Sequence, residues 1–242
     1  MRYHTAVGVL VALCVAVTAV AAEPKPKDSG VLVFGGAGQL GADIVKELVK
    51  RGEAVTVFVK PSTDRARLNG LPIAFVVGDA RTDADVRTAF RAAKFRVAIN
   101  ALARRDNEEH FWDRTQMSIT AAAKATGVKE VVFLSSVGVG DSAATYAPEA
   151  YARSKDGLLD RGKSEEDLKA SGLDYLIIRT GSVLTPTTPA TGKARFTEDR
   201  MNLGPVTRPD LAVLTVDCLG KAACRNKTFH ATDDTLKIPA QR

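Results

Sequence analysis

Val31-Leu-Val-Phe-Gly35-Gly36-Ala37-Gly38-Gln39-Leu40-Gly41 is the stretch that decides the fold. A buried apolar run leads into three glycines spaced three apart, and an amphipathic segment follows from 39 to 51. The first glycine allows a tight turn, the second lets the backbone approach a pyrophosphate, and the third lets a helix pack closely on a strand. The helix start also presents N–H groups and a favourable dipole to phosphates. The stretch therefore predicts a dinucleotide site at Gly35, Gly38, Gln39, Leu40 and Gly41.

The rest of the chain repeats this alternation of strand and helix. Apolar runs of strand length follow at 55–59, 73–77, 97–100, 131–134, 175–178 and 228–231. Helical patterns lie between or after them, at 83–93, 108–126, 151–170 and 209–224. Strands that are apolar throughout and alternate with helices are typical of a parallel sheet buried on both faces. The sequence predicts an α/β fold, a doubly wound parallel sheet, in a single Rossmann-type domain over 30–242.

The first residues have the composition of a targeting segment. Residues 5–22 carry no charge, follow Arg2 and end in Ala19-Val20-Ala21, as a secretory signal peptide does. A polar, proline-bearing linker over 23–29 comes next. We expect a signal peptide over 1–22 and an exported protein, periplasmic or secreted. An uncleaved membrane anchor through 5–22 is the alternative, because the apolar run is just long enough to span a bilayer.

Charge, cysteine and histidine usage narrow the function further. The net charge is +6, but basic residues are interspersed with acids, so nucleic-acid binding is not indicated. Cys218 and Cys224 lie six apart in a segment expected to be one helix, where they would point to different sides. Two separate buried thiols are expected, although an oxidising compartment leaves a disulfide open. His4, His110 and His230 are far apart in sequence, so no metal site is expected.

The end of the second predicted strand bears on the choice of cofactor. An acid there would bind the ribose hydroxyls of NAD, whereas cations suit the 2′-phosphate of NADP. Val59 is followed by Lys60, with Arg65 close behind. The alternative is a solvated basic loop. We predict NADP with contacts from Lys60 and Arg65, and NAD as the other possibility.

Several motifs together resemble a known family. They are the glycine turn, Val77-Gly-Asp79-Ala80, the run from Ala121 to Ser136, the run from Ser171 to Gly181, and Thr207-Arg-Pro-Asp210. In this order they resemble the atypical short-chain dehydrogenase/reductase proteins, most of all the NmrA-like, NAD(P)H-binding type, over about residues 30–232. The resemblance implies that Asp79 and Ala80 contact the adenine and that Asn100 and Ala101 line the middle of the cofactor. It also implies that Ser135 and Ser136 face the nicotinamide, and that Arg208 and Asp210 are structural.

The same resemblance suggests a catalytic group. Better-known short-chain enzymes use a serine with a Tyr-x-x-x-Lys pair, and this chain has Ser136, Tyr151 and Lys155. Tyr151 would act as the acid, with its pKa lowered by Lys155. The alternative is an ordinary surface pair one helical turn apart. Alignment back from Ser171 also places Arg161 where many relatives of this subgroup have a lysine, a departure from the family pattern.

Two functions follow from these observations. The first is an NADP(H)-dependent oxidoreductase of a small organic substrate. The second is an NADP(H)-sensing interaction protein, with an unknown protein partner, that binds the cofactor without using it, as some NmrA-like relatives do.

Overall fold

Strand β1 (Gly30–Phe34) divides its side chains between two cores. In the computed structural model, which describes residues 30–104 and 108–237, the strand is buried along its whole length. Val31 and Val33 pack into one hydrophobic core, and Leu32 and Phe34 pack into the other. Alternate residues of a strand point to opposite faces, so a strand covered on both sides must be apolar throughout. This is the physical reason for the continuous apolar run.

In the described part of the chain, the sheet has eight strands in the order β3-β2-β1-β4-β5-β6-β8-β7. The remaining bounds are β2 (Val55–Val59), β3 (Ala74–Val77), β4 (Phe95–Asn100), β5 (Glu130–Ser136), β6 (Asp174–Thr180), β7 (Arg195–Thr197) and β8 (Lys227–Thr232). Every neighbouring pair is parallel except β7 with β8. The predicted parallel sheet is confirmed. The short antiparallel edge strand β7 was missed, because three residues in a polar loop carry no detectable periodicity.

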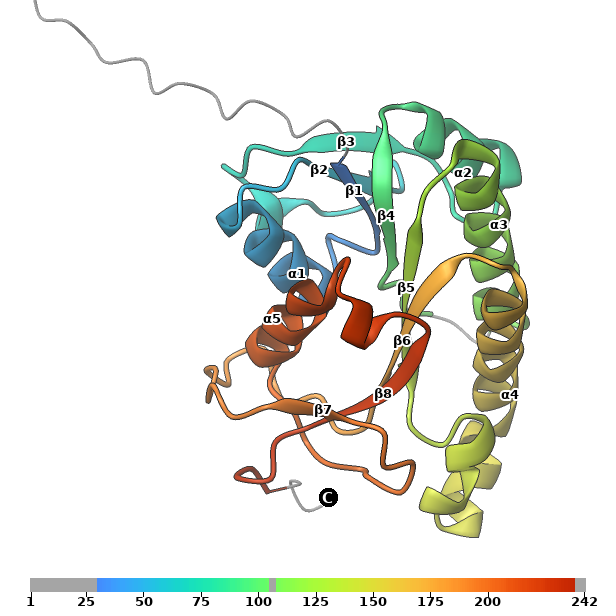
Figure 1. The fold of residues 1–242 in the computed structure, drawn as a ribbon, viewed down its shortest axis with the longest axis vertical. Helices are drawn as coiled ribbons and strands as arrows, with labels where there is room; N and C mark the ends of the chain where they lie inside the picture. The colour runs from blue at the N-terminus through green and yellow to red at the C-terminus, as the bar shows by residue number, and fades with distance from the viewer. Residues whose placement is uncertain (1–29, 105–107, 238–242) are drawn as a thin grey trace, which may run out of the picture.

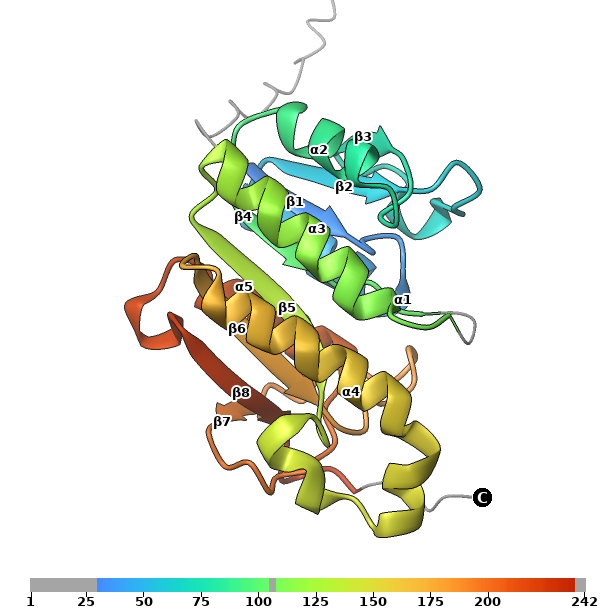
Figure 2. The ribbon, with the colours of Figure 1, turned by 90° about the vertical axis from the view of Figure 1, so that its right-hand side faces the viewer.

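The helices form one layer on each face of the sheet. Helices α1 (Gln39–Lys50) and α5 (Arg208–Cys218) cover one face, and α2 (Asp83–Arg91), α3 (Phe111–Thr126) and α4 (Pro148–Ala170) cover the other (Figure 1). Figure 2 shows α2, α3 and α4 side by side, with the first turns of α4 extending past the sheet. The strand order reverses between β1 and β4, which is where doubly wound folds bind their ligands.

The last helix is shorter than the sequence predicted. Helix α5 ends at Cys218, and the chain turns through Gly220 (φ +72°) before a short 3₁₀ turn at Ala222–Cys224. This turn brings Cys218 and Cys224 to a Cα–Cα distance of 5.5 Å, and they form a disulfide. The expectation of separate thiols was therefore wrong, because it assumed one continuous helix over 209–224.

The start of α5 is structural, as the resemblance implied. The Thr207 hydroxyl accepts a hydrogen bond from the backbone N–H of Asp210 and caps the helix. The Asp210 carboxylate accepts N–H bonds from Thr191 and Gly192, which ties the preceding loop to the helix. Arg208 donates to the carbonyl of Leu184 in the same loop.

The predicted signal peptide and linker, residues 1–29, lie outside the described residues. Within the described ranges, none of the helices combines the length and apolar character needed to cross a bilayer.

Candidate functional site

The glycine turn after β1 is closed on its inner side and open on its outer side. Gly35 has φ +76°, and a Cβ atom there would overlap the carbonyl of Ala101. A Cβ atom at Gly41 would overlap the carbonyl oxygen of Gly35, so the helix can approach the turn only without a side chain. Gly38 donates its N–H to the Gly35 carbonyl at 2.9 Å and is itself exposed. Helix α1 thus begins at Gln39 with its first N–H groups directed outward.

A cleft of about 360 Å³ lies beside this turn, over the carboxyl ends of β1, β2 and β4. Gly35 and Gly38 form one wall, and the segment after β4 forms another. The full lining is Gly35, Ala37, Gly38, Phe58, Val59, Lys60, Ser62, Thr63, Ala80, Arg81, Ala101, Leu102, Ala103, Glu108 and Phe111. The cleft therefore occupies the point of strand-order reversal, and its turn fits a dinucleotide phosphate.

The end of β2 contributes a cation and two hydroxyls to the cleft. Lys60, Ser62 and Thr63 all line it, and the Thr63 hydroxyl accepts the backbone N–H of Lys60 at 3.1 Å. Arg65 does not line it, because its guanidinium lies 4.8 Å from the centre of the Phe75 ring. Of the two cations predicted to bind the 2′-phosphate, the structure brings only Lys60 to the cleft.

The turn after β3 adds a second charged group. Ala80 and Arg81 both line the cleft, and Arg81 was not among the predicted site residues. Asp79 binds Arg81 at 2.5 Å and lies 3.8 Å from the Lys60 ammonium. The hydrogen bond from Arg81 is the main reason that the pKa of Asp79 is lowered to about 2. Asp79 therefore holds two cations at the rim of the cleft.

Of the two predicted residues at the end of β4, one lines the cleft and the other supports the loop that follows. Ala101 lines the cleft. Asn100 is buried, with its amide donating to the Gln116 side chain at 2.8 Å and its oxygen accepting the N–H of Leu102 at 3.1 Å. Asn100 thus shapes the loop from beneath.

The end of β5 contains a buried polar network that the sequence analysis missed. The Ser135 hydroxyl donates to Glu165 at 2.6 Å, and Arg179 binds the same carboxylate at 2.7 and 3.0 Å. Burial lowers the pKa of Arg179, but its hydrogen bonds to Glu165 and Asp141 outweigh burial and raise it. The Ser135 hydroxyl is therefore buried in a hydrogen bond to Glu165, although it was expected to face the nicotinamide. A signal was available, since Ser135 and Arg179 are polar residues that each directly follow a predicted strand, and they are paired in the sheet.

The three predicted catalytic residues are not brought together. Ser136 ends β5 and donates to the Val137 carbonyl. On α4, Glu165 is the residue bonded to Ser135, next to Ser136. Tyr151 precedes Glu165 by fourteen residues, which is about 21 Å along a helix axis. Lys155 is exposed on α4, about one helical turn after Tyr151. Arg161 lies only one helical turn from Glu165.

A different set of residues gathers around Arg161. Its guanidinium lies 3.4 Å from the centre of the Trp112 ring, on α3. The Tyr146 ring lies so close to Gly138, just after β5, that a Cβ atom at Gly138 would overlap it. Tyr146 therefore lies against the segment that follows β5, a relation that the sequence did not predict.

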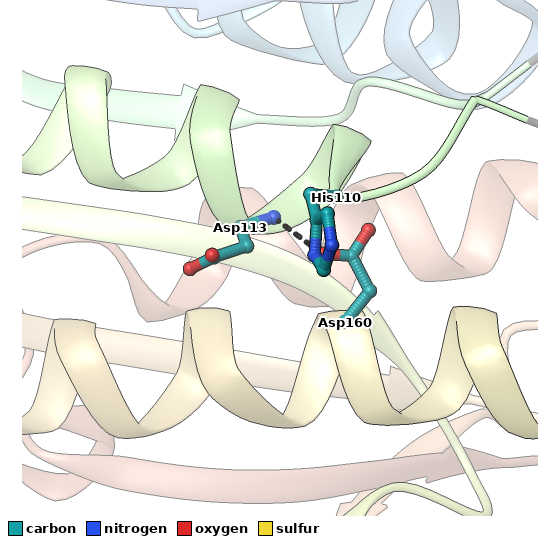
Figure 3. Close-up of side chains that lie close together, drawn as sticks. All are labelled: His110, Asp113 and Asp160. Carbon is teal, nitrogen blue, oxygen red and sulfur yellow. Dashed lines mark hydrogen bonds between the residues drawn. The ribbon is translucent and has the colours of Figure 1, made fainter.

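His110, Asp113 and Asp160 form another cluster, with one potential ligand atom of each within 4.8 Å of the others. The Asp160 carboxylate accepts the N–H groups of Trp112 and Asp113 at 2.9 and 3.0 Å, and Figure 3 shows the second of these bonds. Asp113 in turn binds Lys163 at 2.5 Å. Asp160 of α4 thus caps the start of α3, which explains the cluster. The grouping is not evident from the sequence, because Asp160 of α4 is far along the chain from His110 and Asp113.

Comparison with known proteins agrees with this geometry. A family model described as NAD(P)H-binding matches residues 35–222. Sterol demethylase protein B of Methylococcus capsulatus is 29% identical over 170 residues, which cover 64% of this chain and 52% of that protein. The chain therefore matches about half the length of this relative.

Solved structures share the fold. The anaerobillin reductase ChuY of Escherichia coli O157:H7 superposes with a TM-score of 0.76 at 23% identity, covering 87% of this chain and 100% of that one. A short-chain dehydrogenase/reductase of Veillonella parvula in complex with NADP superposes with a TM-score of 0.67 at 14% identity, covering 85% and 95%. With its glycine turn, its doubly wound sheet and a family match over most of its length, the chain belongs to the NAD(P)H-binding family of Rossmann-fold proteins.

Proposed function

We propose that this protein is an NADP(H)-dependent reductase of a small organic substrate. The observation that carries the proposal is the cleft at the strand-order reversal, into which the glycine turn and the start of α1 open. Backbone N–H groups at a helix start, with no side chain at Gly38 in the way, fit a pyrophosphate. The names of two similar proteins, an anaerobillin reductase and a dehydrogenase/reductase in complex with NADP, support the same reading.

The preference for NADP rests on the end of β2. Lys60 with the hydroxyls of Ser62 and Thr63 offers one charge and several hydrogen bonds to a 2′-phosphate. The one acid lining the described cleft, Glu108, lies at 3.5 Å from Arg81. Calorimetric titration with NADPH and NADH tests both parts. We expect NADPH to bind about tenfold more tightly than NADH. No heat with either dinucleotide would refute the proposal.

A bound nicotinamide supplies a hydride, and the protein must supply a proton. The sequence proposes Ser136, Tyr151 and Lys155 for this task, and the proximity of the Tyr146 ring to Gly138, just after β5, supports Tyr146 as a second candidate. Single substitutions Tyr151→Phe and Tyr146→Phe separate the two. The donor is the tyrosine whose loss lowers kcat about 100-fold or more while NADPH affinity is unchanged.

The second candidate, an NADP(H)-sensing interaction protein, is favoured by the separation of Tyr151 and Lys155 from Ser136. It predicts cofactor binding without NADPH oxidation across a broad panel of carbonyl compounds and quinones. It also predicts a protein partner whose capture changes with the redox state of the cofactor and survives Tyr151→Phe. Substrate-dependent loss of NADPH absorbance would decide for the reductase.

We also propose that the protein is exported. The charge-free segment over 5–22 is the reason, and the disulfide between Cys218 and Cys224 supports it, because such bonds persist in oxidising compartments. Sequencing of the mature protein should find Ala22 or Glu23 at its N-terminus. An intact N-terminus on membrane-bound protein would instead indicate an anchor.

A further inference from the structure

Two arginines share one aromatic ring beside the cofactor cleft. The Trp112 ring, on the first turn of α3, has the Arg161 guanidinium 3.4 Å and the Arg104 guanidinium 4.9 Å from its centre. Arg104 follows β4 and Arg161 belongs to α4, so three segments meet here. Gly157 lies on the same side of α4, where a Cβ atom would come within 3.4 Å of Trp112 and 3.7 Å of Arg104.

The positive charge of this cluster lacks a carboxylate partner in the described part of the chain. The ion pairs described there include neither Arg104 nor Arg161, and the buried Nε of Arg161 has no hydrogen-bond acceptor. Asp160 caps α3, and Glu165 binds Ser135 and Arg179. Both acids attract Arg161 at longer range, and Arg104 donates to the Glu108 backbone carbonyl at 3.0 Å. Neither guanidinium therefore forms an ion pair with a carboxylate of the described residues.

This arrangement is costly unless an anion joins it. Burial, and after it the charge of Arg104, lower the pKa of Arg161 to about 10, an unusual value for a guanidinium. Cation–π contact with the ring offsets part of the cost. Both arginines are half-buried, where the repulsion between like charges is stronger than in water. Strongly perturbed charges of this kind occur often at functional sites.

A cavity reaches the cluster at Arg104 and Gly157, without Arg161 or Trp112 among its lining residues. It has a volume of about 730 Å³. Its lining contains both cations and acids: Arg104, Glu109, His110, Arg153, Ser154, Asp156, Gly157, Leu159, Asp160 and Lys163. It adjoins the cofactor cleft, because Ala103 and Phe111 line the cleft while their neighbours Arg104 and His110 line the cavity. The absence of a side chain at Gly157 keeps the space beside Trp112 and Arg104 open.

We propose that Arg104 and Arg161, held on Trp112, bind a carboxylate group of the substrate. A guanidinium presents a planar fork of N–H donors that matches a carboxylate, and two of them can bind its two oxygens. The substrate class is therefore an organic acid that carries its reducible group a short distance from the carboxylate. As a statement about substrate, this inference rests on the proposed reductase function.

The test uses the fact that Trp112 is the single tryptophan of the chain. Its fluorescence is followed during titration with propionate at constant ionic strength, and with propionamide as a neutral analogue of the same shape. We expect a saturable change with propionate and none with propionamide. Arg161→Gln and Arg104→Gln should each weaken propionate binding about tenfold or more. Arg114→Gln removes an exposed arginine two residues from Trp112 and should leave binding unchanged.

Other outcomes would overturn the inference. They are equal responses to propionate and propionamide, or unchanged propionate affinity in both arginine variants. Thermal unfolding followed by circular dichroism checks that the variants fold. If Arg161→Gln does not fold, the comparison of wild type with Arg104→Gln decides the test. NADPH calorimetry on the same protein keeps the proposals apart. Propionate binding without NADPH binding would refute the reductase and leave the anion site, and the reverse result would refute only the anion site.

Discussion

Lys60 is the residue on which the proposed preference for NADP depends. It lines the cleft at the end of β2, with its ammonium 3.8 Å from the Asp79 carboxylate, while Arg65 is stacked on Phe75. We expect Lys60→Gln to weaken NADPH binding about tenfold, since a charged hydrogen bond to phosphate is lost, and to leave NADH binding nearly unchanged. Arg65→Gln is the matched control and should affect neither. Calorimetry measures all four constants, and an equal loss for both dinucleotides would remove the preference from Lys60.

Glu130 carries a pH-dependent effect on stability. Burial raises its pKa, against the opposing hydrogen bond from the Gly220 N–H at 2.9 Å. A raised pKa means that its contribution to stability is fully present below the unfolded value of about 4.3 and is lost as pH rises through the folded value. Glu130→Gln should therefore raise the unfolding temperature by a few degrees at pH 7.

The pH profile supplies the control for that substitution. Near pH 4 the wild-type carboxyl is largely neutral in the fold, so the gain of Glu130→Gln should shrink or vanish. Glu149→Gln changes an exposed acid in the first turn of α4 and should have little effect at either pH. A loss of stability at pH 7 would mean that the charged form of Glu130 is favoured by the fold.

At the scale of elements, the disulfide fixes the end of α5 and the turn that follows. The model of loop-closure entropy assigns about 2 kcal/mol to a ring this short. Replacing Cys218 and Cys224 together by alanine should lower the free energy of unfolding by about that amount. Reductant should cause a similar loss in the wild type and none in the double variant. An undiminished wild-type stability under reductant would show that the bond is dispensable.

The two halves of helix α4 differ in their position relative to the sheet. Its Tyr151–Lys155 spacing matches a catalytic motif, yet its first turns extend beyond the sheet (Figure 2). Its second half contributes Asp160, Arg161 and Glu165, which cap α3, stack on Trp112 and bind Ser135. Spacing along a helix defines neighbours on that helix, but not the level at which the helix meets the strand ends.

At the scale of the whole molecule, cofactor binding should stabilise the fold. The cleft is built from β1, β2, β4 and the start of α1, so its ligand joins elements at the centre of the sheet. At a concentration 100 times its Kd, NADPH should add about 2.7 kcal/mol. For a chain of this size that corresponds to a rise in Tm of roughly 5–10 °C. Adenosine alone should give a much smaller rise, and an unchanged Tm with NADPH would contradict the assignment of the cleft.

The sequence by itself determined the sheet, the glycine turn and the family. Val31 to Gly41 could be read directly because the constraints are local: alternate burial needs an apolar run, and close approach needs glycine. Only the tertiary structure decided which charges meet. Arg65 lies on Phe75 outside the cleft, and Ser135 binds Glu165. Cys218 is bonded to Cys224, and Arg104 and Arg161 both contact Trp112. These contacts join residues that are far apart in sequence. They depend on how the helices and strands pack against one another, which local sequence patterns do not specify.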